Sequence, residues 1–339
     1  MEPIGMNRSS RTSASVAIVA GILSLGVDVA EAQRQPPPGI QPMSINAEDI
    51  PYPHPVHYLK MTLYGEDVRM AYMDVPPQGV ALGRTVMLFH GMNWFGEYFA
   101  ATIDVLTREG FRVIVPDQIG FGRSSKPIIP YDFNLHAADS KAILDDLGID
   151  QVAIAGHSMG GALATRFARA YPETTTHLVI INQIALTDSR LTRPLRRFDE
   201  TYARSLARNY ESVRRTVEGY FVTYKPEYDR YVDTMYAWTL SGEWPRLAKV
   251  RALNSMALYA DPVVYDRPHI KAKTLFLSGA EDGDDFRELA QWIVDSIPNA
   301  ELHLLDNVGH NPFMEAPDRF FPPFVAFLKS EPLRDTGNQ

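Results

Sequence analysis

Apolar runs recur along the chain from about residue 85 and are separated by segments with helical spacing. Short, continuous apolar runs are typical of strands that are buried on both faces of a parallel sheet. The expected strands are 85–89, 111–115, 152–155, 177–181 and 274–277, with a last strand at 301–305, and the expected helices are 98–109, 135–147, 286–297 and 317–328. Residues 56–75 alternate in polarity, which predicts two antiparallel strands before this series. The pattern therefore predicts an α/β fold with a mostly parallel sheet and helices on both faces.

Residues 184–268 interrupt this alternation, because they have helical spacing and no strong strand pattern. Thirteen aromatic residues lie between Phe198 and Tyr265. An insertion of this length between two sheet strands has to pack somewhere, and over the strand ends it forms a lid. We expect most of these aromatics to pack within the lid and a few to face a cleft.

The first 32 residues have the organisation of an export signal. Arg8 and Arg11 precede the apolar run 14–27, and Ala30-Glu31-Ala32 fits the small-x-small rule for cleavage. The apolar run is too short to span a bilayer comfortably, and the two arginines are not adjacent as a twin-arginine signal requires. We therefore expect a signal peptide at 1–32 and a mature protein that is periplasmic or extracellular.

The remaining boundaries follow from composition and pattern. A proline-rich linker is expected at 33–55, the first part of the core at 56–183, the helical lid at 184–268, the second part of the core at 269–330, and a tail at 331–339. The net charge of −8 argues against a nucleic-acid partner. The absence of cysteine excludes disulfides, a thiolate nucleophile and cysteine-ligated metals. No later run is long and apolar enough to cross a membrane, and the oligomeric state cannot be inferred.

A sharp strand-to-helix turn is predicted at Gly156-His157-Ser158-Met159-Gly160, between the run 152–155 and a helical segment. Small residues are needed at Gly156 and Gly160 because a Cβ there would crowd the turn. The turn exposes the Ser158 hydroxyl at a helix N-terminus, where backbone N–H groups favour developing negative charge. G-x-S-x-G alone is a weak signal, so a catalytic role also requires partners elsewhere in the chain.

A serine hydroxyl needs a general base to attack at neutral pH, and the base needs an orienting acid. On this kind of sheet the expected order is serine, acid, histidine, and the chain supplies Ser158, Asp282 and His310. His157 adjoins the nucleophile, but successive residues of the turn point apart. The acids that compete with Asp282 lie in the same loop and are Glu281, Asp284 and Asp285. We prefer Asp282 because it stands three residues after Gly279, which ends the strand.

Several stretches together resemble the lid-bearing α/β-hydrolase superfamily, over residues 55 to 330 approximately. They are His90-Gly91-Met92-Asn93-Trp94, Asp117-Gln118-Ile119-Gly120-Phe121-Gly122-Arg123-Ser124, the Ser158 turn, Gly279 to Asp282, and Gly309-His310-Asn311-Pro312-Phe313. The resemblance implies that the backbone N–H groups of Met92 and Met159 form the oxyanion hole. It implies no metal and no cofactor.

The resemblance also limits the classes of reaction that the chain is expected to catalyse. Haloalkane dehalogenases and epoxide hydrolases of this fold have aspartate at the nucleophile position of the strand-to-helix turn, called the elbow, whereas this chain has Ser158 there. The leading hypothesis is an exported serine hydrolase that cleaves a carboxylic ester of a small, largely apolar substrate. A lactonase, a carbon–carbon bond hydrolase and a cofactor-free perhydrolase or haloperoxidase stay open, as does a non-catalytic binding protein of the same fold.

The charge of the substrate is a separate question. A carbon–carbon bond hydrolase must hold a charged dienol-keto acid, which requires a buried cation near the serine. Arg193, Arg196 and Arg197 lie among polar neighbours at the start of the insertion and are expected to be solvated. The aromatic and methionine residues that follow favour an uncharged substrate. We therefore expect neutral esters to be cleaved and vinylogous 1,5-diketo acids to react poorly.

Overall fold

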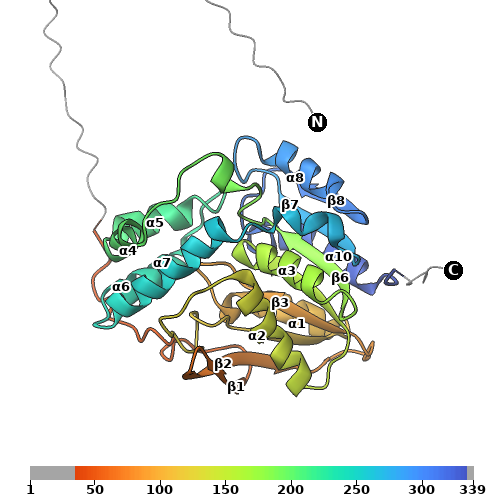
Figure 1. The fold of residues 1–339 in the computed structure, drawn as a ribbon, viewed down its shortest axis with the longest axis horizontal. Helices are drawn as coiled ribbons and strands as arrows, with labels where there is room; N and C mark the ends of the chain where they lie inside the picture. The colour runs from red at the N-terminus through yellow and green to blue at the C-terminus, as the bar shows by residue number, and fades with distance from the viewer. Residues whose placement is uncertain (1–34, 334–339) are drawn as a thin grey trace, which may run out of the picture. The chain divides into compact units, whose positions relative to one another are not determined.

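A computed structural model describes residues 35–333, which are built around one eight-stranded sheet (Figure 1). The strand order is β1-β2-β4-β3-β5-β6-β7-β8. The strands are β1 Val56–Leu63, β2 Glu66–Val75, β3 Thr85–Phe89, β4 Arg112–Pro116, β5 Val152–His157, β6 Thr175–Ile181, β7 Lys273–Gly279 and β8 Ala300–Leu305. These positions confirm the strands predicted from the apolar runs to within two residues at every end.

The sheet is mostly parallel. β1 pairs antiparallel with β2, and β2 pairs antiparallel with β4, whereas all the other pairs are parallel. The carboxyl ends of β3, β5, β6, β7 and β8 therefore lie along one edge of the sheet. Loops after parallel strands are where ligands bind in open α/β sheets, so this edge is where a site is expected.

Helices cover both faces of the sheet (Figure 1). α2 (Phe133–Asp146), α3 (Met159–Ala170) and α8 (Phe286–Asp295) pack in one apolar core. α1 (Ala100–Arg108) and α10 (Pro317–Lys329) pack in the other, and the short α9 (Pro312–Glu315) precedes α10. Side chains of β3 alternate between the two cores, with Met87 on one face and Leu88 on the other. This alternation explains why the strands read as continuous apolar runs.

The segment between β6 and β7 is helical, as the sequence predicts, and it contains four α-helices and several short 3-10 helices. The α-helices are α4 (Phe198–Leu206), α5 (Tyr210–Glu218), α6 (Asp229–Thr239) and α7 (Trp244–Ala260), and Figure 1 shows them grouped on one side of the molecule. They share a core of their own that includes Tyr210, Phe221, Tyr228, Trp238 and Trp244. Many of the aromatics therefore pack within the insertion, as expected.

The proline-rich segment before β1 contains no helix or strand among residues 35–55, but it is not a free linker. Ile45 and Ala47 are buried in the core of the insertion. The backbone N–H of Met43 donates to the carbonyl oxygen of Ala237 at 3.2 Å. This segment therefore belongs to the folded domain, which its proline content did not predict.

The predicted signal peptide, 1–32, lies outside the described residues, as does most of the predicted tail. Within residues 35–333, none of the helices has the length and apolar character needed to cross a bilayer.

Candidate active site

Ser158 occupies a strained turn between β5 and α3. Its backbone has φ 59° and ψ −119°, a conformation that L-residues rarely adopt. A Cβ on Gly156 would lie 2.0 Å from the carbonyl oxygen of Gly160, and one on Gly160 would lie 2.1 Å from that of Phe89. The two glycines are therefore required by close backbone approach, as the sequence pattern predicts. Ser158 is left just before the first turn of α3, where N–H groups have no acceptor within the helix.

Asp282 and His310 lie side by side, although they come from the loops after β7 and β8. The Nδ1 atom of His310 is 2.8 Å from Oδ2 of Asp282. A neutral imidazole that donates from Nδ1 presents Nε2 as an acceptor, which is the form needed for a general base. The structure thus brings together the two residues that were predicted as acid and base.

Asn182, directly after β6, fixes the position of Asp282. Its Nδ2 donates to Oδ2 of Asp282 at 3.0 Å and to the carbonyl oxygen of Gly279 at 3.1 Å. Its Oδ1 accepts the N–H of Gly279 at 2.9 Å. Through these three hydrogen bonds Asn182 holds the loop that carries Asp282 in place.

The competing acids of this loop point elsewhere. Glu281 pairs with Arg287 at 2.9 Å, and Arg287 also pairs with Asp306 at 2.7 Å. Asp284 and Asp285 are exposed. Only Asp282, among the acids of residues 281–285, contacts the imidazole of His310.

His157 is not a second base but part of a buried hydrogen-bond relay. Its Nε2 donates to the carbonyl oxygen of His310 at 2.8 Å, so its Nδ1 accepts from the Tyr98 hydroxyl at 3.0 Å. The Tyr98 oxygen in turn accepts the N–H of Gly91 at 3.1 Å. Burial lowers the pKa of His157 well below its usual value, and the neighbouring charge of His310 adds to this effect. His157 therefore stays neutral and links the loop after β3 to the backbone of His310.

The two predicted oxyanion donors, Met92 and Met159, belong to segments that adjoin Ser158. A Cβ on Gly91 would lie only 3.0 Å from the Cβ of Ser158, so the loop that continues into Met92 abuts the elbow. Met159 is the first residue of α3, and its N–H is one of those that lack an acceptor within the helix. Met159 follows Ser158 in the chain, and Met92 follows the glycine that abuts it; their role as oxyanion donors stays a prediction.

The helical insertion reaches the site through Tyr220. The ring of Tyr220 stacks on that of His310 with centroids 5.0 Å apart, and its carbonyl oxygen accepts the N–H of His310 at 2.8 Å. Its hydroxyl accepts from Nδ2 of Asn93, the residue after Met92. An aromatic side chain of the insertion thus faces the site, as the sequence analysis expected for a few of them.

Two arginines that the sequence analysis missed also lie here. The guanidinium of Arg251, on α7, donates to Oδ1 of Asn93 and to the carbonyl oxygen of Met92, the latter at 3.4 Å. Arg208, which follows α4, donates to the same Oδ1 at 3.4 Å. Both side chains are partly buried. The sequence carries a signal for Arg251. It lies at i+7 on the face of α7 whose positions i, i+3 and i+4 are the apolar, buried residues Trp244, Leu247 and Ala248.

Arg193, Arg196 and Arg197 are exposed, as predicted. The expectation of an uncharged substrate rests on those three arginines and on the aromatic and methionine residues that follow them, and it takes no account of Arg208 and Arg251. Arg208 and Arg251 change that argument because they put positive charge beside the loop that holds Met92.

The other strand-end residues support the loops. His90 accepts the N–H of Gln118 at Nε2, 3.0 Å away, and its Nδ1 donates to the carbonyl oxygen of Gly91. Asp117 accepts hydrogen bonds from the Tyr52 hydroxyl at 2.5 Å and from the N–H of Gly96 at 2.7 Å. These residues shape the loops after β3 and β4 and have no contact with His310 among the interactions of residues 35–333.

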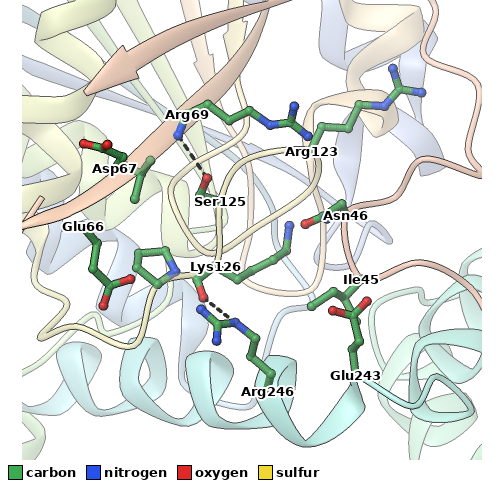
Figure 2. A pocket seen from close by; sticks show the side chains of 12 residues that line it. Ile45, Asn46, Glu66, Asp67, Arg69, Arg123, Ser125, Lys126, Glu243 and Arg246 are labelled. Atoms are coloured by element: carbon green, nitrogen blue, oxygen red, sulfur yellow. Dashed lines mark hydrogen bonds between the residues drawn. The ribbon is translucent and has the colours of Figure 1, made fainter. Parts of the chain in front are cut away.

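A separate polar cavity of about 270 Å³ lies between β2, the loop after β4 and the start of α7 (Figure 2). It is lined by charged side chains of both signs, which are Glu66, Asp67, Arg69, Arg123, Lys126, Glu243 and Arg246. None of Ser158, Asp282 and His310 lines it. The Lys126 ammonium is held by carbonyl oxygens of the same loop, including those of Gly122 at 2.5 Å and Ser124 at 2.7 Å. This cavity is therefore distinct from the candidate active site.

Comparisons with known proteins agree with this fold. A family profile for the alpha/beta hydrolase fold matches residues 84–317. The solved structure of a probable hydrolytic enzyme from Pseudomonas aeruginosa PAO1 is 34% identical, with a TM-score of 0.83, and the match covers 86% of this chain and 99% of that one. Lipase 1 of Psychrobacter immobilis is 26% identical over 79% of this chain and 82% of its own length. A 2-hydroxy-6-oxo-6-phenylhexa-2,4-dienoate hydrolase of Burkholderia cepacia is 26% identical over 70% of this chain and 85% of its own.

Proposed function

This chain belongs to the α/β hydrolase fold family, and we propose that it is a serine hydrolase that cleaves carboxylic esters of small, largely apolar substrates. The hydrogen bond between His310 and Asp282 at 2.8 Å is the observation that carries this proposal. The strained turn that holds Ser158 is linked to His310 through the neighbouring His157, which bonds the carbonyl oxygen of His310. The likeness to a lipase of Psychrobacter immobilis supports ester hydrolysis.

In the proposed mechanism, Ser158 Oγ attacks the ester carbonyl while Nε2 of His310 takes its proton. Asp282 holds the imidazole and stabilises the cation that forms. The N–H groups of Met92 and Met159 bind the oxyanion. His310 then gives its proton to the leaving alcohol, and a water molecule, activated by His310, hydrolyses the acyl-enzyme and regenerates Ser158.

The relative position of the insertion supports a role as a lid. Tyr220 and Arg251 come from the insertion and contact His310 and the Met92 loop, respectively. An ester that reaches Ser158 would therefore meet the insertion as well as the sheet edge. We propose that the insertion supplies part of the substrate pocket.

A fluorophosphonate probe tests this function directly. We expect it to label Ser158, found by mass spectrometry of the labelled peptide, and we expect the unlabelled protein to hydrolyse p-nitrophenyl acylates with saturation kinetics. A protein that binds ligands without chemistry would give neither result. Labelling at another residue would assign the nucleophile elsewhere.

A carbon–carbon bond hydrolase is the second candidate, and one observation favours it. Arg208 and Arg251 could hold the charged group that a vinylogous 1,5-diketo acid carries. We nevertheless expect esters to be the better substrates. Steady-state rates on p-nitrophenyl acylates and on diketo acids decide between them, because a higher kcat/KM on the diketo acid would replace ester cleavage as the function.

A further inference from the structure

Two guanidinium groups share one neutral acceptor beside the candidate active site. Arg208 and Arg251 both donate to Oδ1 of Asn93, and Arg251 also donates to the carbonyl oxygen of Met92. A guanidinium has five N–H donors, so most donors of each side chain remain available. Amide and carbonyl oxygens carry no net charge and cannot neutralise two cations.

No carboxylate pairs with either arginine among residues 35–333, although most of the other partly buried arginines there have one. Arg166, for example, is paired with Asp261 and Asp266. Burial lowers the pKa of both Arg208 and Arg251, and the charge of Arg208 lowers that of Arg251 further. Two like charges held close together with incomplete solvation are costly unless an anion joins them. The two arginines therefore carry positive charge that no carboxylate of residues 35–333 offsets, and one anion bound to both would offset it.

The two arginines are connected to the reacting groups through a short chain of contacts. Arg251 contacts the carbonyl oxygen of Met92, whose N–H is a proposed oxyanion donor. Asn93 donates to the hydroxyl of Tyr220, and the ring of Tyr220 stacks on that of His310. An anion on Arg208 and Arg251 would consequently lie within the reach of a substrate whose carbonyl group is at Ser158.

We propose that Arg208 and Arg251 form a subsite for a carboxylate carried by the substrate. The natural substrate would then be an otherwise largely apolar ester with a carboxylate on its acyl or its alcohol part. Guanidinium groups bind carboxylates through charge-assisted, often bidentate hydrogen bonds, which suits this pair. This inference rests on the proposed ester hydrolysis for its substrate class, but the binding of a carboxylate can be measured without turnover.

Matched pairs of esters test the subsite. On the acyl side the pair is monoethyl adipate and ethyl adipamate, and on the alcohol side it is 4-butyryloxybenzoate and 4-butyryloxybenzamide. Each pair replaces a carboxylate by a neutral amide of nearly the same shape. We expect kcat/KM to be about 10- to 100-fold higher for the carboxylate of one pair, and the pair that shows it identifies which part of the substrate carries the charge.

Arginine variants show whether that preference comes from the proposed subsite. Arg208→Met and Arg251→Met should each lower the carboxylate-to-amide ratio of kcat/KM, and the double variant should bring it close to one. Arg196→Met is the matched control, because Arg196 is an exposed arginine of the same insertion, and it should keep the ratio. Equal rates for both members of each pair in the unchanged protein, or an unaltered ratio in the double variant, would overturn the proposal.

A binding measurement separates this proposal from the proposed function. In the Ser158→Ala variant, adipate should raise the melting temperature in a concentration-dependent way, whereas adipamide should not. Adding the substitutions Arg208→Met and Arg251→Met should abolish the shift. If a fluorophosphonate labels Ser158 but adipate gives no shift, the subsite is wrong and ester hydrolysis stands. If adipate gives the shift but Ser158 is not labelled, the subsite stands and the proposed chemistry fails.

Discussion

His157 donates a hydrogen bond from Nε2 to the carbonyl oxygen of His310 at 2.8 Å, across a sequence separation of 153 residues. Through Tyr98 the same imidazole is tied to the N–H of Gly91, beside the oxyanion loop. The backbone of the proposed base and the loop of one proposed oxyanion donor are thus parts of one buried network.

Removing the Tyr98 hydroxyl should impair turnover more than substrate binding. Tyr98→Phe leaves the N–H of Gly91 and Nδ1 of His157 without partners, so the Gly91 loop and His310 lose a shared support. We expect kcat to fall by about tenfold, with KM nearly unchanged. Tyr131→Phe is the control, because it also removes a buried hydroxyl that is hydrogen-bonded, at 2.8 Å to Pro127. If both variants lose stability alike and neither loses kcat, the network is purely structural.

Ser158→Ala should abolish ester hydrolysis while the protein stays folded. Loss of the nucleophile should lower kcat by on the order of 10⁴-fold or more. Alanine also lacks the hydroxyl that a fluorophosphonate modifies, so labelling should disappear. Circular dichroism and the melting temperature show that the fold is kept. A variant that retained more than about a tenth of the activity would exclude Ser158 as the nucleophile.

Asp282→Asn should cost far more rate than Glu281→Gln. The amide would favour the wrong tautomer of His310, whereas Glu281 pairs with Arg287 outside the site. We expect a loss on the order of 10⁴-fold for Asp282→Asn and little change for Glu281→Gln, both measured as kcat on a p-nitrophenyl ester. Equal rates in the two variants would place the acid elsewhere.

Asp139 should make the domain less stable as the pH rises. Its carboxyl is buried, with Oδ2 unpartnered, and burial raises its pKa from 3.8 to about 7, with a smaller contribution from Asp132. At a pH between these two pKa values, the Asp139 carboxyl is ionised in the unfolded chain and protonated in the folded one. The free energy of unfolding therefore falls as the pH rises through this range, and it levels off above pH 7.

The Asp139→Asn variant should remove this fall, which is roughly a few kcal/mol between pH 4 and 8. Urea unfolding across that range measures it. The control is Asp150→Asn, at an exposed carboxyl of the same region, which should keep the pH dependence of the unchanged protein. Parallel pH profiles for Asp139→Asn and the unchanged protein would contradict a raised pKa at this residue.

Export should remove about the first 32 residues, because Arg8 and Arg11, the apolar run 14–27 and Ala30-Glu31-Ala32 have the organisation of a cleaved signal. N-terminal sequencing of the protein exported from its native host measures the start of the mature chain. A mature chain that begins at Met1 would refute both the signal peptide and the cleavage site.

The strands and the residues at their ends were predictable because their signals are local. A buried parallel strand is a continuous apolar run. Ser158 and Asp282 follow such runs in β5 and β7, and His310 follows the last strand, β8. Since parallel strands end at one edge, their loops have to converge. No knowledge of side-chain packing is needed for that inference.

The charged part of the site was not predictable in the same way. Arg208 and Arg251 meet Asn93 only because helices of the insertion fold back over the loop after β3, and sequence spacing does not determine how those helices cross. The turn geometry argues against His157 as a base, but it does not reveal that His157 supports His310, a partner 153 residues away. Long-range polar contacts of this kind leave no periodic pattern.

The proline-rich segment that precedes the sheet ties the helical insertion to the core. Met43 is bonded to Ala237 of the insertion, and Tyr52 is bonded to Asp117 of the core, so one short run of chain is anchored at both ends. An outward movement of α6 would either break the hydrogen bond between Met43 and Ala237 or stretch the chain between Met43 and Tyr52. A protein trimmed to begin at Val56 would therefore lose a restraint between the insertion and the core, although a comparison of catalytic motifs would discard these residues as a leader.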